Sequence, residues 1–292
     1  AALAAEVYDG GFCGDATTAI EPQVEALLAQ MSVTDKTAQM HGATFVAGIW
    51  HTPDNVPLGI PGLAMTDGPR GVGAATGHAT AFPVGMARGA TWDPALEERV
   101  GEAMGAEVRG KGGSMLLAPT INMLRHPRWG RAQETYGEDT VHMGRMADGF
   151  IRGVQQHVIA NAKHYAGNSI ENTRFNVDVT IDERTLREVY LPHFRTAVRD
   201  AHVGSVMTAY NKTNGQYCSE NVHLIHDVLK GDWAFDGFVE PHMHPWDALA
   251  GLLLVEEAGG RVNAFLEGDG LTKGNETIAA TPALYAMIAS AL

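Results

Sequence analysis

The sequence predicts an α/β fold of the (β/α)8 TIM-barrel-like type, and three observations support this prediction. The chain has 292 residues, enough for one barrel-sized domain or for a domain with a small appendage. Short apolar runs alternate with amphipathic helical stretches, as in parallel sheets that carry helices outside. Several of the apolar runs end in polar or charged residues, and a barrel gathers such ends at one mouth. The first two observations also allow a doubly wound sheet, whereas the third favours the barrel.

The individual elements follow from the spacing of apolar residues. Five runs rich in β-forming residues are predicted as strands, at residues 63–66, 114–119, 158–163, 204–210 and 237–240. Helical patterns are predicted at residues 94–111, 140–156, 183–201 and 220–231. An earlier helix is predicted over residues 22–40, with Pro22 in its first turn.

The composition restricts the class of partner. The chain carries 21 basic and 34 acidic side chains, a net charge of −13 at pH 7, which argues against nucleic acid or an anionic membrane surface as partner. No apolar run reaches the length needed to span a membrane. The first five residues, AALAA, fit both the remainder of a cleaved signal peptide and an ordinary terminus. An exported and a cytoplasmic location therefore both stay open.

Polar residues at the predicted strand ends suggest a site for a sugar. Asp67 follows the first strand, Lys163 and His164 end the third, and Tyr210 ends the fourth. A pyranose presents a ring of hydroxyls that donate and accept, so its site needs an acceptor carboxylate and several charged donors. Together with Arg131, these residues supply that mixture without a metal. For each residue taken singly, a structural role remains open, such as Asp67 capping the turn before Gly68.

Five motifs, in order along residues 20–239, resemble the N-terminal barrel of glycoside hydrolase family 3, the β-glucosidase and β-xylosidase group. They are TDGPRG at 66–71, HPRWGR at 126–131, ETYGED at 134–139, KHYAGN at 163–168 and MTAYN at 207–211. The resemblance implies that Asp67 accepts hydrogen bonds from sugar hydroxyls and that Arg131, Lys163 and His164 line the same subsite. It also implies that Arg174 and Tyr210 approach the sugar or orient the nucleophile. The implied partner is a small carbohydrate substrate, with no cofactor.

The family's catalytic nucleophile is not matched in this chain. Retaining glycosidases use two carboxyl groups about 5–5.5 Å apart, one to attack the anomeric carbon and one to protonate the leaving oxygen. In the family, the nucleophile is an aspartate just beyond the strand that here reads DGFV at 236–239, and His242 stands in its position. Glu240 is a candidate substitute, because two residues earlier on an extended strand it points to the same side. A polar residue at the strand end with no catalytic role is the alternative reading of Glu240.

From residue 240 onward, a second resemblance begins. The runs EPHMHPWDALAG at 240–251 and EEAGG at 256–260 resemble the C-terminal signature of the inositol monophosphatase superfamily, in its histidinol-phosphatase-like members. This predicts two parts, residues 1–239 and 240–292, and an apparent chimera. The resemblance implies that Asp247 is the remnant of a Mg²⁺ ligand, since the acidic run that completes such a site is absent upstream. An acidic residue in the first turn of a helix is the alternative reading of Asp247.

The resemblance to glycoside hydrolase family 3 implies O-glycosyl hydrolysis of β-linked glucosides or xylosides, of the retaining type, in carbohydrate metabolism. Two alternatives remain. One is a Mg²⁺-dependent phosphomonoesterase, which only residues 240–292 support. The other is a sugar-binding chain that catalyses nothing.

Overall fold

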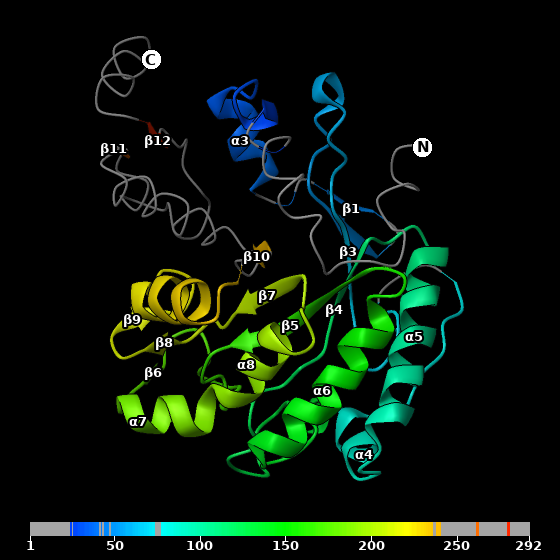
Figure 1. Cartoon of the computed structure of the whole chain (residues 1–292), viewed down its shortest axis with the longest axis vertical. Helices are drawn as coiled ribbons and strands as arrows, with labels where there is room; N and C mark the ends of the chain where they lie inside the picture. The colour runs from blue at the N-terminus through cyan, green and yellow to red at the C-terminus, as the bar shows by residue number, and fades with distance from the viewer. Residues whose placement is uncertain are drawn as a thin grey trace.

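A seven-stranded sheet forms the centre of the computed structural model, which describes residues 24, 26–40, 42, 44–46, 48–73, 77–235, 238–240, 261–262 and 279–280. In order across the sheet the strands are β1 (Thr44–Val46), β2 (Ile49–His51), β3 (Ala64–Asp67), β4 (Met115–Leu117), β5 (Ile159–Tyr165), β7 (Ser205–Thr208) and β10 (Phe238–Glu240) (Figure 1). β3, β4, β5, β7 and β10 run parallel. These are the five predicted strands, and all are confirmed.

Helices cover one face of the parallel strands (Figure 1). The main ones are α5 (Pro94–Gly110), α6 (Thr140–Val154) and α8 (Pro192–Arg199), with the short α4 (Gly85–Gly89) before α5. Asp93 and Asp139 accept hydrogen bonds from backbone N–H groups in the first turns of α5 and α6, so each helix begins where its aspartate can cap it. The predicted helices at 94–111 and 140–156 are confirmed.

Two predicted helices are interrupted. The single helix predicted over 22–40 is wrong, because Ser32 and Asp35 form a capping box that begins α3 (Val33–Gln39) anew. The stretch predicted as one helix over 183–201 divides into α7 (Glu183–Thr185), the π-helical η3 (Leu186–Tyr190) and α8. Pro192 has no N–H to continue the hydrogen-bond ladder of the preceding turns.

The remaining elements are short. The 3₁₀-helix η1 (Val56–Leu58) follows β2, and the 3₁₀-helix η2 (Ala132–Glu134) lies between β4 and α6. The predicted helix at 220–231 is the π-helical η4 (His223–Asp232). Sequence patterns did not predict the antiparallel β1–β2 pair or the small sheet of β6 (Asp178–Val179), β8 (Lys212–Thr213) and β9 (Gln216–Tyr217). Beyond residue 240, the described residues are β11 (Arg261–Val262) and β12 (Ala279–Ala280), which pair antiparallel.

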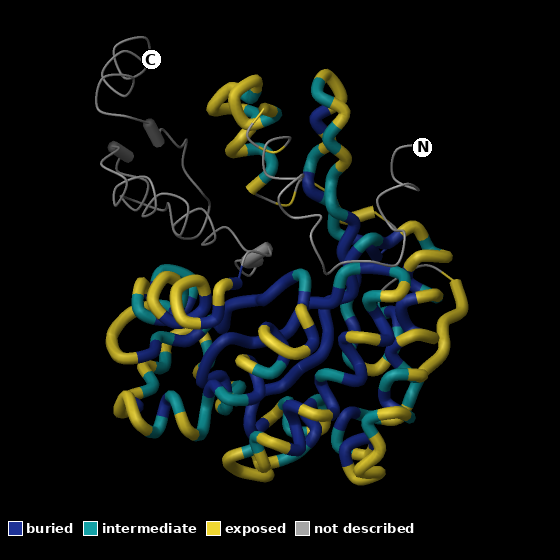
Figure 2. The backbone as a smooth tube through the Cα atoms, viewed as in Figure 1, coloured by how far each residue is buried: buried dark blue, intermediate teal, exposed yellow. Residues whose placement is uncertain are grey.

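The sheet separates two apolar clusters, because alternate residues of a strand face opposite sides. Leu116, Ala160 and Val206 belong to the large cluster that includes the buried faces of the helices. Their neighbours Met115, Leu117 and Met207 pack with Met65 in a smaller cluster on the other face. The strands β3, β4, β5 and β7 are accordingly buried on both faces, and the outer surfaces of the helices are exposed (Figure 2). Burial on both faces is typical of a parallel α/β sheet.

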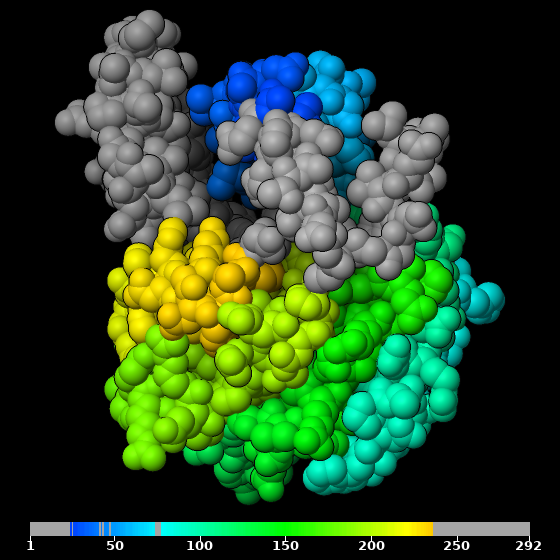
Figure 3. All heavy atoms as spheres, viewed as in Figure 1, coloured from blue at the N-terminus to red at the C-terminus, as the bar shows by residue number. Residues whose placement is uncertain are grey.

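Glycines allow α5 and α6 to pack closely side by side (Figure 3). A Cβ at Gly153 would lie 2.0 Å from the carbonyl oxygen of Glu98, and one at Gly101 would lie 2.3 Å from that of Phe150. Any side chain at these two positions would force the helices apart. Close packing of these helices fixes the positions of the loops that enter them.

Within the described residues, β1 and β10 form the two edges of the sheet, so this part of the chain does not close a barrel. None of the described helices has the combined length and apolar character that crossing a membrane would require.

Candidate functional site

The predicted site residues leave the sheet at its carboxyl-terminal edge. Asp67 is the last residue of β3, Lys163 and His164 lie near the end of β5, and Tyr210 comes two residues after β7. Lys163 is in register with Met207, which packs in the smaller cluster on the face of the sheet opposite the helices, here called the inner face. Asp67 lies two residues beyond Met65 of the same cluster, so both charged residues continue inner-face rows of the sheet.

Asp67 and Lys163 form an ion pair at this edge. The Nζ atom of Lys163 lies 3.1 Å from Oδ1 of Asp67. The lysine side chain is only 3% exposed, whereas the aspartate side chain is 49% exposed. The second carboxylate oxygen, Oδ2, accepts no hydrogen bond from the described residues. The carboxylate of Asp67 is therefore open to solvent as a hydrogen-bond acceptor, and the ammonium group of Lys163 is buried beneath it.

A tight turn fixes the carboxylate of Asp67. The N–H of Gly73 donates to the carbonyl of Asp67 at 2.6 Å, and the hydroxyl of Thr66 donates to the carbonyl of Gly73 at 3.0 Å. Gly71 in this turn has φ +136°, and a Cβ there would lie 2.2 Å from the carbonyl oxygen of Thr80. Only glycine fits at that position.

Arg131 is held by a bidentate contact with Glu134. Nε donates to Oε1 at 2.7 Å and an Nη atom donates to Oε2 at 2.6 Å, while the hydroxyl of Thr120 donates to Oε2 at 3.2 Å. Burial alone would lower the pKa of the guanidinium. The hydrogen bond and charge of Glu134, followed by the charges of Glu171 and Asp67, instead raise that pKa above its ordinary value. Arg131 is therefore a permanent cation within the field of Asp67.

One tautomer of His164 fits its contacts with Arg131 and Asn122. A guanidinium can only donate, so the Nη atom of Arg131 at 3.0 Å makes Nε2 of His164 an acceptor. The proton then lies on Nδ1, which donates to Oδ1 of Asn122 at 3.0 Å. The amide nitrogen of Asn122 donates to the carbonyl of His164 at 2.7 Å, which fixes the amide orientation. His164 is fully buried, and its contact with the guanidinium helps to orient Arg131.

Arg174 and Tyr210 make a second contact group beside the first. The guanidinium carbon of Arg174 lies 4.8 Å from the ring centroid of Tyr210. Arg174 also donates to Oε1 of Glu171 at 2.7 Å. The charge of Glu171 also raises the pKa of Arg131. The glutamate therefore interacts with both arginines.

The structure therefore brings together Asp67 with Lys163, Arg131 with His164, and Arg174 with Tyr210. Sequence reasoning did not single out Glu134, Asn122 or Glu171, which orient these residues. The spacing of three residues between Arg131 and Glu134, and between Glu171 and Arg174, was the available signal. Nothing in the sequence indicated the contact between Asn122 and His164.

Of the catalytic and metal candidates, only Glu240 belongs to the described residues. The backbone of Glu240 pairs with Met207, which pairs with Lys163, so Glu240 lies two strands from Lys163 in the same row, about 10 Å away. His242 and Asp247 lie outside the described residues. In the described part of the chain, no three His, Cys, Asp or Glu side chains stand close enough to share a metal ion.

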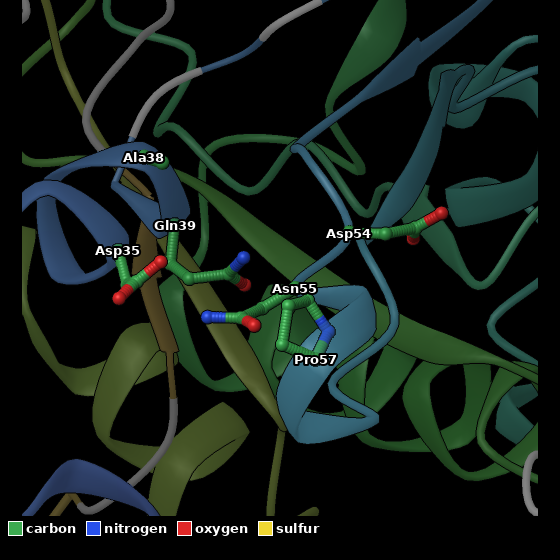
Figure 4. Close-up of a pocket in the computed structure, with 6 residues that line it drawn as sticks. All are labelled: Asp35, Ala38, Gln39, Asp54, Asn55 and Pro57. Atoms are coloured by element: carbon green, nitrogen blue, oxygen red, sulfur yellow. The ribbon is translucent and has the colours of Figure 1, made fainter. Parts of the chain in front are cut away.

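A shallow pocket near the N-terminus is separate from these residues. It is lined by Asp35, Ala38, Gln39, Asp54, Asn55 and Pro57, from α3 and the segment around η1 (Figure 4). Asp35 already accepts the capping hydrogen bonds of Ser32, and Asp54 accepts one from the N–H of Gly62. Its volume of about 90 Å³ is well below the ~300–1,000 Å³ of ligand pockets, so it is not a candidate site.

Comparison with known families identifies the fold. The model for the glycosyl hydrolase family 3 N-terminal domain matches residues 20–242. The chain belongs to this family. Family membership and the solved relatives place the fold in the (β/α)8 barrel class, as the sequence predicted.

The relatives of this family 3 chain include several β-glucosidases. A β-glucosidase of Rhizobium radiobacter is 44% identical over 222 residues, which cover 74% of this chain and 27% of that protein. Thermostable β-glucosidase B of Acetivibrio thermocellus is 41% identical over 228 residues, covering 74% and 30%. Among solved structures, β-glucosidase 3B from Thermotoga neapolitana in complex with α-D-glucose superposes with a TM-score of 0.74 and 39% identity, covering 78% of this chain and 36% of that one. The chain thus spans about a third or less of the length of each.

Proposed function

We propose that this chain is the sugar-binding barrel of an O-glycosyl hydrolase of the β-glucosidase type. The observation that carries the proposal is the Asp67–Lys163 pair, in which a half-exposed carboxylate is backed by a buried ammonium at the mouth of the sheet. The similar solved structure of β-glucosidase 3B is a complex with α-D-glucose, which supports glucose as the sugar.

The proposed division of roles follows from the hydrogen-bonding capacity of each side chain. Oδ2 of Asp67 accepts from a sugar hydroxyl. Lys163 uses one of its three N–H groups on Asp67 and can donate another to the sugar. Arg131, oriented by Glu134 and His164, supplies a second fixed cation. Charge-assisted hydrogen bonds from preorganised groups are the interactions that select a polyhydroxylated ligand.

Bond cleavage needs two carboxyl groups, and no residue of this chain matches the family's nucleophile. With His242 in that position, the proposal assigns sugar recognition to residues 1–239 and names Glu240 as the candidate substitute. We further propose that residues 240–292 are a segment related to the inositol monophosphatase superfamily. The family 3 match ends at residue 242, close to this boundary.

Asp67→Asn is expected to weaken glucose binding about tenfold or more. The substitution keeps the shape of the side chain but removes the charge that strengthens its hydrogen bonds to the sugar and to Lys163. The measurement is calorimetric titration of the full chain with glucose.

The matched control is Asp148→Asn, which removes the same charge from a helical ion pair with Arg152 on α6. This variant should bind glucose as the unmodified chain does. Equal glucose affinity in Asp67→Asn and the unmodified chain would contradict the proposed site, as would the absence of any glucose binding by the unmodified chain.

The purified chain is expected to hydrolyse 4-nitrophenyl β-glucoside no faster than buffer. A histidine at position 242 cannot form the glycosyl ester through which retaining enzymes proceed. Because enzymes accelerate reactions at least ~10⁶-fold, even a small residual activity is measurable.

Hydrolysis that is lost in Glu240→Gln would contradict this expectation and identify Glu240 as the nucleophile. In the same preparation, Mg²⁺-dependent release of phosphate from a phosphomonoester would favour the phosphomonoesterase alternative if it is lost in Asp247→Asn. His242→Asp alone should not restore full turnover, because the acid/base carboxyl group is also unmatched.

A further inference from the structure

Beside the charged site lies a cluster that we call the aromatic wall, formed by Arg174, Phe175 and Tyr210. The ring centroids of Phe175 and Tyr210 are 4.6 Å apart with an interplanar angle of 59°. The guanidinium carbon of Arg174 lies 4.7 Å from the Phe175 centroid and 4.8 Å from the Tyr210 centroid. The cation therefore contacts both rings, an arrangement that holds them together.

The aromatic wall adjoins the residues proposed to bind the sugar. Tyr210 leaves the sheet three residues after Met207, which is in register with Lys163. Arg174 is bound by Glu171, whose charge raises the pKa of Arg131. Glu171 also packs against Gly130, the neighbour of Arg131, where an added Cβ would lie 3.0 Å from the Cβ of Glu171. The wall is thus linked to the charged site through Glu171 and through the end of β7.

The loop that carries Phe175 is tied down at several points. The N–H groups of Asn176 and Val177 both donate to the carbonyl of Thr173 at 2.9 Å. The N–H of Lys212 donates to the carbonyl of Val177 at 3.0 Å, which attaches the loop to the segment after Tyr210. The phenyl ring is held in place before any ligand arrives, which reduces the ordering needed on binding.

Despite these contacts, the Phe175 side chain remains apolar and open, with 45% of its surface exposed. It offers no hydrogen-bonding group to a hydroxyl, unlike Asp67, Lys163 and Arg131. An exposed aromatic ring that borders a polar site is suited to the part of a ligand that carries no hydroxyls. In a glucoside, that part is the aglycone beyond the glycosidic oxygen.

We propose that Phe175 is the platform for an aromatic aglycone, so that the chain prefers aryl over small alkyl β-glucosides. This inference rests on the proposed function, since the glucose ring must first occupy the charged site. Phe175 determines which aglycone is bound more tightly, and the charged residues determine that a sugar is bound.

The test measures binding of two S-linked glucosides, phenyl and methyl 1-thio-β-D-glucoside, by calorimetry with the full chain. The two ligands share the glucose ring and differ only in the aglycone, and the sulfur linkage removes turnover from the measurement. The unmodified chain should bind the phenyl compound about threefold to tenfold more tightly, the range that one aromatic stack supplies. Phe175→Ala should reduce this ratio to near one and leave the affinity for the methyl compound within about twofold.

Two further variants sharpen the result. Ile170→Ala removes an apolar side chain from the same loop, also 45% exposed, and should leave the ratio unchanged. Phe175→Leu keeps an apolar side chain without a ring and should give an intermediate ratio. It also serves as the readout if the alanine variant fails to fold.

The outcomes distinguish failure of the aglycone platform from failure of the sugar site. Equal affinity of the unmodified chain for both thioglucosides would overturn the aglycone platform and leave the sugar site standing. Loss of both ligands in a folded Phe175→Ala variant would also overturn it, because Phe175 would then belong to the glucose subsite. Binding of neither ligand by the unmodified chain would overturn the proposed function and this inference together.

Discussion

Arg88→Met is expected to lower the free energy of unfolding by about 3–5 kcal/mol, because it leaves Glu97 as an uncompensated buried carboxylate. Nε of Arg88 contacts both carboxylate oxygens of Glu97 at 3.0 Å, and the two side chains are 5% and 1% exposed. The hydroxyl of Tyr136 donates to the same carboxylate at 2.7 Å. Denaturant unfolding of the variant and the unmodified chain measures the difference.

The same substitution should also weaken sugar binding. An Nη atom of Arg88 donates to the carbonyls of Pro69 at 2.8 Å and Pro83 at 2.9 Å, and Pro69 belongs to the turn that follows Asp67. Without the guanidinium, that turn loses a fixed donor. The ion pair thus connects the packing of α4 and α5 to the position of the site.

The control is Arg184→Met, which removes an arginine paired with Glu188 on the surface, where the two side chains are 82% and 60% exposed. Exposed pairs contribute little, so this variant should change stability by no more than about 0.5 kcal/mol. The double variant Arg88→Met, Glu97→Leu should be more stable than Arg88→Met alone, because it removes the orphaned charge. Equal effects of the Arg88 and Arg184 substitutions would contradict a special role for the buried pair.

Lowering the pH from 7 to 5 is expected to cost the protein about 2 kcal/mol of stability through His193 alone. This residue lies on α8, is 1% exposed, and neither ring nitrogen has a hydrogen-bond partner among the described residues. Burial lowers its pKa from 6.5 to about 3. The unfolded chain therefore binds a proton below pH 6.5 that the native chain does not bind until about pH 3, so stability falls as the pH falls through this window.

The measurement compares unfolding free energies at pH 7 and pH 5 for the unmodified chain and for His193→Leu. The leucine variant should lose about 2 kcal/mol less between the two pH values, because it has no group to protonate. His226→Leu, at an exposed position on η4, is the control and should follow the unmodified chain. Parallel pH profiles for His193→Leu and the unmodified chain would show that His193 does not titrate as its burial implies.

The elements predicted best are those whose local pattern agrees with their tertiary setting. The five parallel strands, α5 and α6 follow directly from apolar periodicity and from the capping residues Asp93 and Asp139. The prediction failed at residues 22–40, where the capping box of Ser32 and Asp35 outweighed a helical pattern on both sides. It did not predict β1 and β2, an antiparallel pair in which every residue of β1 is exposed.

The sequence by itself determined the fold class and placed polar residues at the ends of strands, since both depend on residues close together in the chain. Its resemblance to family 3 also predicted that His242 stands in the position of the family's nucleophile. The tertiary structure decided how those residues act. Asp67 meets Lys163 from 96 positions away, and Asn122 fixes the tautomer of His164 from 42 positions away. Such pairs depend on strand register and loop course, which no local pattern encodes. His164 becomes buried while the carboxylate of Asp67 stays half-exposed, and this difference arises only when the strands assemble.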